Sequence, residues 1–232
     1  MKILAIDSSS VAGSVALLED GEIKAEYLTL DKRTHSETLL PLVDKLKSET
    51  NLELSSLDAI AVTGGPGSYT GLRIGGATVK GLGLALDKPI VNVPTMEALA
   101  YNVVGSDVLV CPMMDARKNR VFTGLYKFDG EKIQVVKDQC VLTIDELVDE
   151  IDEEVIFLGD GVGAYRDLLD EKMSVSHSFA DEDDNYVKAS SFVYLAKINF
   201  DEGKTISADE FRPDYLMLSQ AERELKEKQK ND

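Results

Sequence analysis

The turn Asp7–Ser10 (sequence DSSS) joins a carboxylate to three hydroxyls directly after the apolar run Ile3–Ile6. Oxygen groups at the end of a buried strand could contact a magnesium–phosphate ligand, and Asp7 and Ser9 are the candidate cofactor contacts. A polar residue that ends a strand more commonly hydrogen-bonds its own turn. We interpret this turn as structural and keep nucleotide chemistry at Asp7 as the alternative.

A second turn, Gly64–Gly71, could hold an anion on the backbone amides at the start of a helix. Gly65 and Arg73 are the candidate contacts there. No Gly-Lys-Ser/Thr follows, which excludes a Walker A phosphate loop. The dinucleotide fingerprint anchored on Gly65 also fails, because its third glycine is replaced by Thr70. We interpret the segment as a tight strand-to-helix turn, with weak anion binding as the alternative.

Metal and hydrolytic chemistry find little support in the sequence. His35 and His177 are the only histidines, and Cys111 and Cys140 have no metal-site spacing. An all-carboxylate magnesium site remains open because acidic residues are plentiful, but their spacing singles none out. Ser68 does not lie in a Gly-x-Ser-x-Gly elbow, which disfavours Ser-His-Asp hydrolysis. The sequence predicts no catalytic residue and no metal ligand.

The chain is strongly acidic, with a formal net charge of −17 over 232 residues. This charge argues against direct, sequence-independent binding to a phosphate backbone. The segment Asp115–Arg120 is a basic exception, which we interpret as a hairpin turn, with a phosphate contact as the alternative. The cysteine usage fits a reducing compartment, and no apolar stretch reaches the roughly 18 residues of a membrane span. We expect a cytoplasmic protein with no membrane partner.

The first half of the sequence predicts the order β-β-β-α-β-α-β-α. Its strands are expected at Ile3–Ile6, Ser14–Leu18, Ile23–Leu30, Asp58–Val62 and Ile90–Val93. Thr34 and Glu37 form a capping box that begins a helix. Within that helix, Pro41 predicts a kink or a first turn that is not α-helical.

A helix of small apolar residues is expected from Tyr69 to about Leu86. Five glycines lie in it or at its edge, namely Gly71, Gly75, Gly76, Gly81 and Gly83. Each interior glycine costs roughly 1 kcal/mol relative to alanine, so something must offset that cost. Close approach of a neighbour would do so, and the neighbour could be a phosphate, the chain's own sheet or a second protein.

The second half repeats this order, and Glu154–Tyr165 aligns without gaps on Asp58–Tyr69. Its elements are strands at Val108–Met114, Val121–Phe128 and Ile133–Val136, a capping box at Thr143–Glu146 and an acidic loop at Met173–Lys188. Tyr215 and Leu216 are expected to close the fold after a last helix, Ala189–Phe200. The chain is thus predicted as a duplicated α/β protein. The expected parts are an N-terminal lobe over 1–104, a C-terminal lobe over 105–220 and a charged tail over 221–232.

Four segments of the sequence together resemble the bacterial TsaB (YeaZ) family. They are Ile6–Ser9 followed by Ser14–Leu17, then His35–Pro41 (HSETLLP), Gly65–Gly75 (GPGSYTGLRIG) and Pro213–Leu216 (PDYL). Gly65–Gly75 is the most specific of the four, and together they span nearly the whole chain. The resemblance implies the two-lobed actin/Hsp70-like (ribonuclease H-like) fold, in which each lobe is a mixed sheet with flanking helices.

The resemblance also implies a role in forming threonylcarbamoyladenosine in tRNA. Members are non-catalytic relatives of TsaD, the subunit that transfers the threonylcarbamoyl group. They pair with TsaD through first-lobe helices, a TsaE ATPase joins the pair, and they self-associate as homodimers when the partner is absent. The isolated chain is then expected to bind no cofactor, with ATP or ADP and Mg possible only at the partner interface. Contact with tRNA is expected to be indirect, although Asp115–Arg120 could touch RNA held by the partner.

The expected partner interface lies on the helix that begins at Thr34 and on the glycine helix. Its residues are His35, Leu39, Leu40, Leu42, Val43, Leu46, Gly71, Gly75 and Lys80. The structural alternative is that the apolar stripe faces the sheet and that His35 caps its helix. Two other functions remain open: an ATP-dependent kinase or ATPase of the actin-like class, which the duplication and Asp7 motivate, and, less favoured, a glycoprotease-like peptidase. Serines fill the first turn where such ATPases usually need glycine, and the histidine pair of TsaD-like enzymes is missing.

Overall fold

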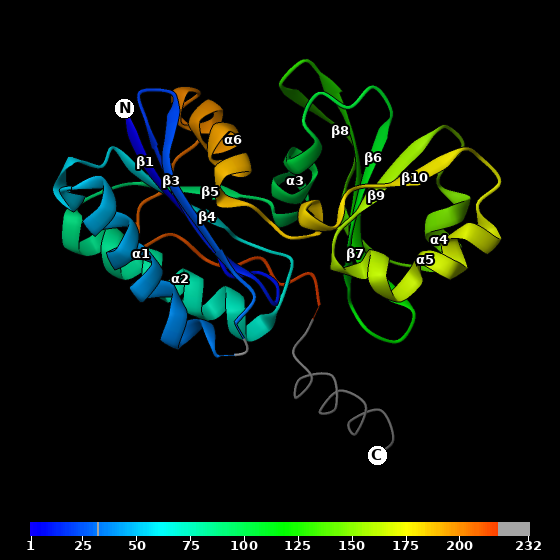
Figure 1. Cartoon of the computed structure of the whole chain (residues 1–232), viewed down its shortest axis with the longest axis horizontal. Helices are drawn as coiled ribbons and strands as arrows, with labels where there is room; N and C mark the ends of the chain where they lie inside the picture. Colours follow the sequence, from blue (N-terminus) through cyan, green and yellow to red (C-terminus); the bar gives the residue numbers. More distant parts are fainter. Residues whose placement is uncertain (32, 218–232) are drawn as a thin grey trace.

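The computed structural model describes residues 1–31 and 33–217, which form two five-stranded mixed sheets (Figure 1). The first sheet has the order β3-β2-β1-β4-β5, with strands β1 (Lys2–Asp7), β2 (Gly13–Glu19), β3 (Glu22–Thr29), β4 (Ala59–Thr63) and β5 (Ile90–Val93). The second has the order β10-β9-β6-β7-β8, with strands β6 (Leu109–Asp115), β7 (Arg120–Asp129), β8 (Lys132–Thr143), β9 (Val155–Leu158) and β10 (His177–Phe179). The predicted charged tail, 221–232, lies outside the described residues.

The two sheets repeat one pattern of strand pairing. In the first, β1 pairs antiparallel with β2 and parallel with β4, and in the second, β6 pairs antiparallel with β7 and parallel with β9. The repeated order and direction confirm the predicted fold class, two lobes that each hold a mixed sheet. The predicted loop over Met173–Lys188 is wrong in part, because it contains β10, which pairs with β9. Three residues at a sheet edge are too short to show a period in the sequence.

The helices that flank the sheets are α1 (His35–Thr50), α2 (Tyr69–Leu86), α3 (Thr95–Ala100), α4 (Ile144–Asp149), α5 (Asp160–Lys172) and α6 (Ala189–Asp201). Helices α1, α2, α4 and α5 cover the outer faces. Residues of α1 and α2 form one core with β1 and β4, and α4 and α5 form another with β6 and β9. Helix α1 begins with an α-helical turn and continues through Pro41, which excludes the expected non-helical first turn. No helix within the described part of the chain has the length and hydropathy needed to cross a membrane.

The other two helices, α3 and α6, each pack on the sheet formed by the opposite half of the chain. Helix α3, from the first half of the chain, packs on β6 and β7 of the second sheet. Helix α6, from the second half, packs on β1, β2 and β5 of the first sheet. Both lie between the two sheets in Figure 1. The chain therefore returns to the first sheet at residue 189.

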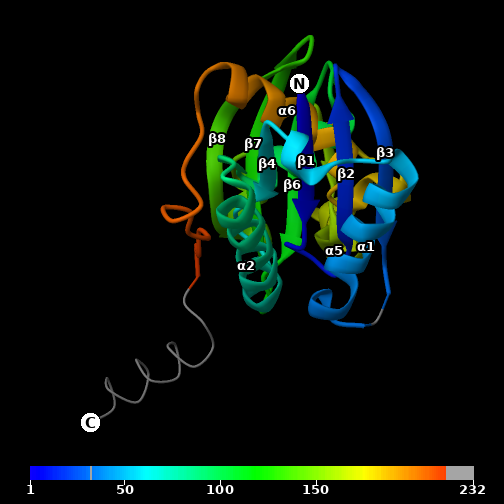
Figure 2. The same cartoon turned by 90° about the vertical axis from the view of Figure 1, so that its left-hand side faces the viewer.

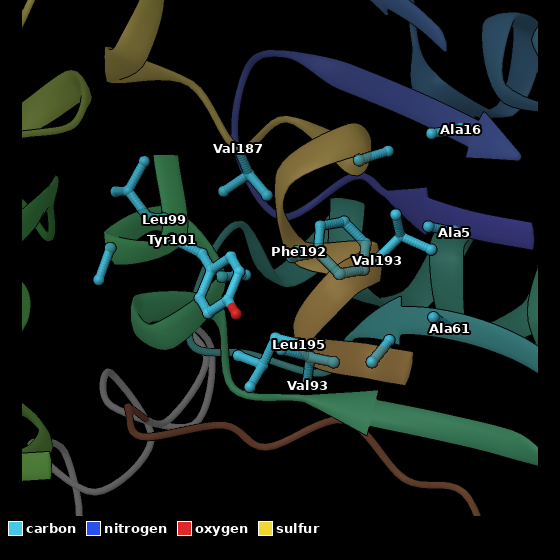
Figure 3. Packing of buried hydrophobic residues seen from close by; sticks show 14 of the residues in the cluster. Ala5, Ala16, Ala61, Val93, Leu99, Tyr101, Val187, Phe192, Val193 and Leu195 are labelled. Carbon is cyan, nitrogen blue, oxygen red and sulfur yellow. The ribbon is translucent and has the colours of Figure 1, made fainter. Parts of the chain in front are cut away.

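One hydrophobic core consequently joins both lobes. It combines Ala5 and Ala61 of the first sheet with Phe192 of α6, and Leu99 of α3 with Val110 of the second sheet. Figure 3 shows Phe192 and Val193 beside Ala5, with Tyr101 and Leu99 nearby. Because the side chains of each exchanged helix fill the space beside the other lobe's sheet, neither sheet can be covered by its own half of the chain alone.

After α6 the chain runs back along α2 as a strap, which we define as residues 206–216. Ile206 forms an antiparallel bridge with Ile90, and the backbone N–H of Asp214 donates to the Gly64 carbonyl over 2.6 Å. Phe211 is 1% exposed, whereas Tyr215 is 39% exposed. The expectation that Tyr215 and Leu216 close the fold is therefore corrected, because Phe211 is the side chain that the hydrophobic effect buries there.

The shared core predicts that the two lobes unfold together. Phe192→Ala should lower the free energy of unfolding by about 3–5 kcal/mol, because it removes a fully buried aromatic ring between the lobes. The matched control is Tyr194→Ala on the same helix, whose ring is 37% exposed and whose loss should cost less. Urea unfolding followed by circular dichroism and tyrosine fluorescence measures both. Separate transitions for the two lobes, or equal losses for the two variants, would contradict the shared core.

Candidate functional site

A cleft of about 430 Å³ opens between the lobes. Its first-lobe wall comes from the turn after β1 and the start of α2, and its second-lobe wall from the end of β6, the following turn and the start of α5. The lining residues are Ser9, Ser10, Val11, Gly67, Ser68, Met114, Asp115, Arg117, Phe122, Asp160 and Ala164. Two helix N-termini therefore reach this cleft, which makes it the first place to look for a bound ligand.

Asp7 lies fully buried behind this wall. One carboxylate oxygen accepts hydrogen bonds from the Ser9 amide over 3.1 Å, from the Ser9 hydroxyl over 2.6 Å and from the Thr63 hydroxyl. Burial raises the pKa of the Asp7 carboxyl. Its other oxygen has no hydrogen-bond partner among the described residues. This arrangement is that of an acceptor that holds its own turn together, which is the structural interpretation of DSSS.

Two glycines of α2, Gly71 and Gly75, and Gly67 just before the helix face this same turn. A Cβ at Gly71 would collide with the Ser8 carbonyl oxygen, and one at Gly67 would collide with the Ser9 carbonyl oxygen. A Cβ at Gly75 would meet the Ser8 hydroxyl, which donates to the Gly71 carbonyl over 2.9 Å. The close neighbour is therefore the chain's own backbone. Because carbonyl oxygens carry partial negative charge, they also oppose a phosphate at these positions.

The second-lobe wall is a network built on Asp115. Its carboxylate accepts from the Arg117 amide and from the Tyr165 hydroxyl, each over 2.9 Å. The Asp160 carboxylate accepts from the Asp115 amide over 3.2 Å, and burial raises the pKa of Asp160. The Ala116 amide bonds the Arg120 carbonyl over 2.9 Å, so Asp115–Arg120 is the hairpin turn that the sequence predicts.

Candidates for hydrolysis and metal binding have structural roles. The Ser68 hydroxyl accepts from the Gly71 amide over 3.3 Å and thereby caps α2. The His35 ring lies 2.9 Å from the Ser10 carbonyl, and His177 bonds Asp170. The described residues contain no group of three or more histidine, cysteine or carboxylate side chains placed to hold a metal ion.

The predicted interface residues divide into inner and outer sets. The inner set, Leu39, Val43, Leu46, Gly71 and Gly75, is buried against the sheet or the first turn. Leu42 and His35 are half-buried, and Lys80 donates to the carbonyls of Asp209 and Phe211 in the strap. Leu40, which is 53% exposed, faces outward.

The outward side of α2 is the part of the predicted partner surface whose residues the sequence analysis did not single out. It presents Ala77, Gly81, Leu84 and Ala85, all exposed, and Leu84 is 57% exposed. A Cβ at Gly81 would meet no atom within 4 Å. We call Leu40, Ala77, Gly81, Leu84 and Ala85 the α1–α2 outer surface. Figure 2 shows α1 and α2 side by side on this face. Helical spacing opposite the buried Gly75 was the signal that could have located it.

The two glycine environments of α2 predict opposite effects of adding one methyl group. Gly71→Ala should lower the free energy of unfolding by about 1–3 kcal/mol, because its Cβ would press on the Ser8 backbone. Gly81→Ala should raise it by about 0.5–1 kcal/mol, because the methyl group enters open space and restricts the unfolded chain. Urea denaturation compares the pair. A neutral Gly71→Ala would contradict the interlocked turns.

The sequence is similar to a known protein family and to two characterised bacterial proteins. The family model for TsaD, tRNA N6-adenosine threonylcarbamoyltransferase, matches residues 26–225. The tRNA threonylcarbamoyladenosine biosynthesis protein TsaB of Bacillus subtilis (strain 168) is 36% identical, over 99% of this chain and 100% of that protein. The protein of the same name from Escherichia coli (strain K12) is 30% identical, over 97% of this chain and 98% of that protein.

Solved structures also include a similar protein over nearly the full chain. YeaZ from Pseudomonas aeruginosa matches with a TM-score of 0.80 and 30% identity, over 93% of this chain and 99% of that chain. The activator of the 2-hydroxyisocaproyl-CoA dehydratase from Clostridium difficile matches with a TM-score of 0.54 and 10% identity, over 88% of this chain and 97% of that one. The second likeness concerns the fold alone, which is of the actin/Hsp70 type. On the full-length matches, the chain belongs to the TsaB (YeaZ) family.

Proposed function

We propose that this chain is a non-catalytic scaffold subunit that pairs with a TsaD-type threonylcarbamoyltransferase and supports formation of threonylcarbamoyladenosine in tRNA. A TsaE-type ATPase joins the pair, and tRNA is held mainly by the partner. The observation that carries the proposal is that the two sides of α2 differ: one packs on the chain's own first turn and the other is exposed. Its glycines on one side are filled by the chain's own Ser8 and Ser9, while its other side exposes small and apolar residues.

The α1–α2 outer surface suits a partner helix. Ala77 and Gly81 are small, so another backbone can approach α2 closely, and Leu84 on α2 and Leu40 on the neighbouring α1 supply exposed apolar area. Burying apolar surface there contributes about 25 cal/mol per Å². The same surface is available to a second copy of this chain, so it also serves the homodimer proposed when the transferase is absent.

The absence of catalysis is proposed from what the candidate groups already do. Asp7 accepts three hydrogen bonds from its own turn and strand β4, and Ser68 caps α2. The carbonyl oxygens of Ser8 and Ser9 occupy the space in which a nucleotide phosphate would approach the glycine backbone. Nucleotide and magnesium are therefore proposed to bind only where the partner completes a site. The alternative, an ATPase of the actin-like class, is motivated by the inter-lobe cleft.

The outer surface predicts which substitutions disrupt the complex. Leu84→Arg should weaken binding to the transferase about 30-fold or more, because it places a charge at the centre of an apolar contact. Leu40→Arg should act in the same direction. The control is Val136→Arg on β8, an apolar residue with a similar exposure of 53%. Binding is measured by calorimetry, and self-association by analytical ultracentrifugation. Wild-type binding by both Leu variants would contradict this docking surface.

The filled glycine positions also predict how the isolated chain responds to nucleotide. Titration of the purified chain with Mg-ATP in a calorimeter should show no binding in the micromolar range, and the chain should show no ATP turnover. The reference is the assembled complex with the transferase, measured under the same conditions. Micromolar binding by the isolated chain, lost on Asp7→Asn substitution, would establish the ATPase alternative in place of the scaffold.

A further inference from the structure

The turn between β6 and β7 presents positive charge on an acidic protein. Arg117 and Lys118 are exposed there, the Arg117 side chain being 87% exposed, on a chain whose net charge is −17. Arg117 also lines the cleft between the lobes. The Asp115 carboxylate lies 3.5 Å from its guanidinium, and an exposed pair of this kind contributes little free energy. The guanidinium can therefore exchange that partner for a phosphate.

The backbone of this turn is strained and firmly held. Three consecutive residues have left-handed φ angles: Arg117 (67°), Lys118 (56°) and Asn119 (58°). For residues with a Cβ this conformation costs roughly 1–2 kcal/mol each. Asp115 holds the turn by accepting from the Arg117 amide and the Tyr165 hydroxyl, and the Ile144 amide bonds the Asn119 carbonyl over 3.3 Å. Strain that the surrounding structure maintains in this way is typical of functional sites.

A pair of tyrosine rings starts one residue after Ser68, which lines the first-lobe wall of the cleft. Tyr69 directly follows Ser68 of that wall, and the Tyr215 ring of the strap lies 4.8 Å from the Tyr69 ring. The Arg73 guanidinium lies 4.1 Å from the centre of the Tyr69 ring. Of the two tyrosine rings, that of Tyr215 is the more exposed. Exposed aromatic rings with arginine beside them are what unpaired nucleic-acid bases stack on.

We propose that RNA contacts this chain directly, at the β6–β7 turn beside the inter-lobe cleft and at the exposed ring of Tyr215 on the strap. Arg117 and Lys118 bind phosphates of the RNA backbone, and Tyr215 stacks on an unpaired base. This inference rests on the proposed function, because the partner brings and holds most of the RNA. A chain with a net charge of −17 repels a nucleic acid on its own, so the contact adds to binding that the complex supplies.

The phosphate contact is tested in the assembled complex with the transferase. An end-labelled, unmodified tRNA transcript is titrated at several salt concentrations against complexes carrying Arg117→Ala with Lys118→Ala. The slope of log affinity against log salt should become shallower by about 1 for each cation removed. The control, Lys127→Ala with Lys132→Ala, removes two lysines at the other end of β7 and β8 and should leave the slope at the wild-type value.

The stacking contact gives a different signature in the same titration. Tyr215→Ala should weaken RNA binding about fivefold or more with the salt slope unchanged, because stacking releases no counterions. Its control is Tyr194→Ala, a tyrosine of similar exposure on α6. Wild-type affinity for the Tyr215 variant would overturn the stacking contact.

Equal salt slopes for the Arg117/Lys118 variant and its control would overturn the phosphate contact. Failure of that variant to join the complex, where the control joins, would assign the turn to a protein interface and overturn the RNA contact as well. If the wild-type chain forms no complex with the transferase, the docking proposed above is contradicted instead. The same pair of variants, titrated without the transferase, then decides the present inference, and equal slopes overturn it.

Discussion

The contact between the first turn and helix α2 determines most of what this molecule can do. The Ser8 and Ser9 carbonyls lie so close to Gly67 and Gly71 that no side chain fits between them. The contact fixes how α2 is rotated about its axis. It also places negative ends of dipoles where a phosphate-binding loop would need positive ones. The outward side of the same helix is left with small and apolar residues, and the proposed role as a scaffold follows from that division.

The exchanged helices connect the two halves of the chain. Helix α6 packs on the first sheet and α3 on the second, so each sheet is covered in part by a helix from the other half. The strap adds a second connection, since the Gln139 amide on β8 donates to the Asp214 carboxylate while Asp214 bonds Gly64. The core around Phe192 and the strap thus both hold the two lobes together.

Much of the fold could be predicted from the sequence, because apolar runs, turn residues and capping boxes mark most strands and helices locally. The bounds of α2, Tyr69 and Leu86, agree with prediction, since glycine spacing and a polar turn mark both ends. The side of α2 that faces inward could not be predicted, because Gly71 and Gly81 look alike to any count of small residues and the residue that covers Gly71, Ser8, lies more than 60 positions away. The position of α6 escaped for the same reason. A helix with apolar residues fits either sheet, and only the three-dimensional packing selects one.

The late position of α6 in the chain has a consequence for synthesis of the protein. On the ribosome, β1 to β5 emerge long before the helix that covers one face of their sheet, so that face stays exposed to solvent until residues 189–201 leave the exit tunnel. Nascent chains with exposed apolar strands are prone to aggregation and are bound by chaperones. The order of the elements thus makes the synthesis of α6, and not that of the five strands, the event that lets the first sheet reach its native packing.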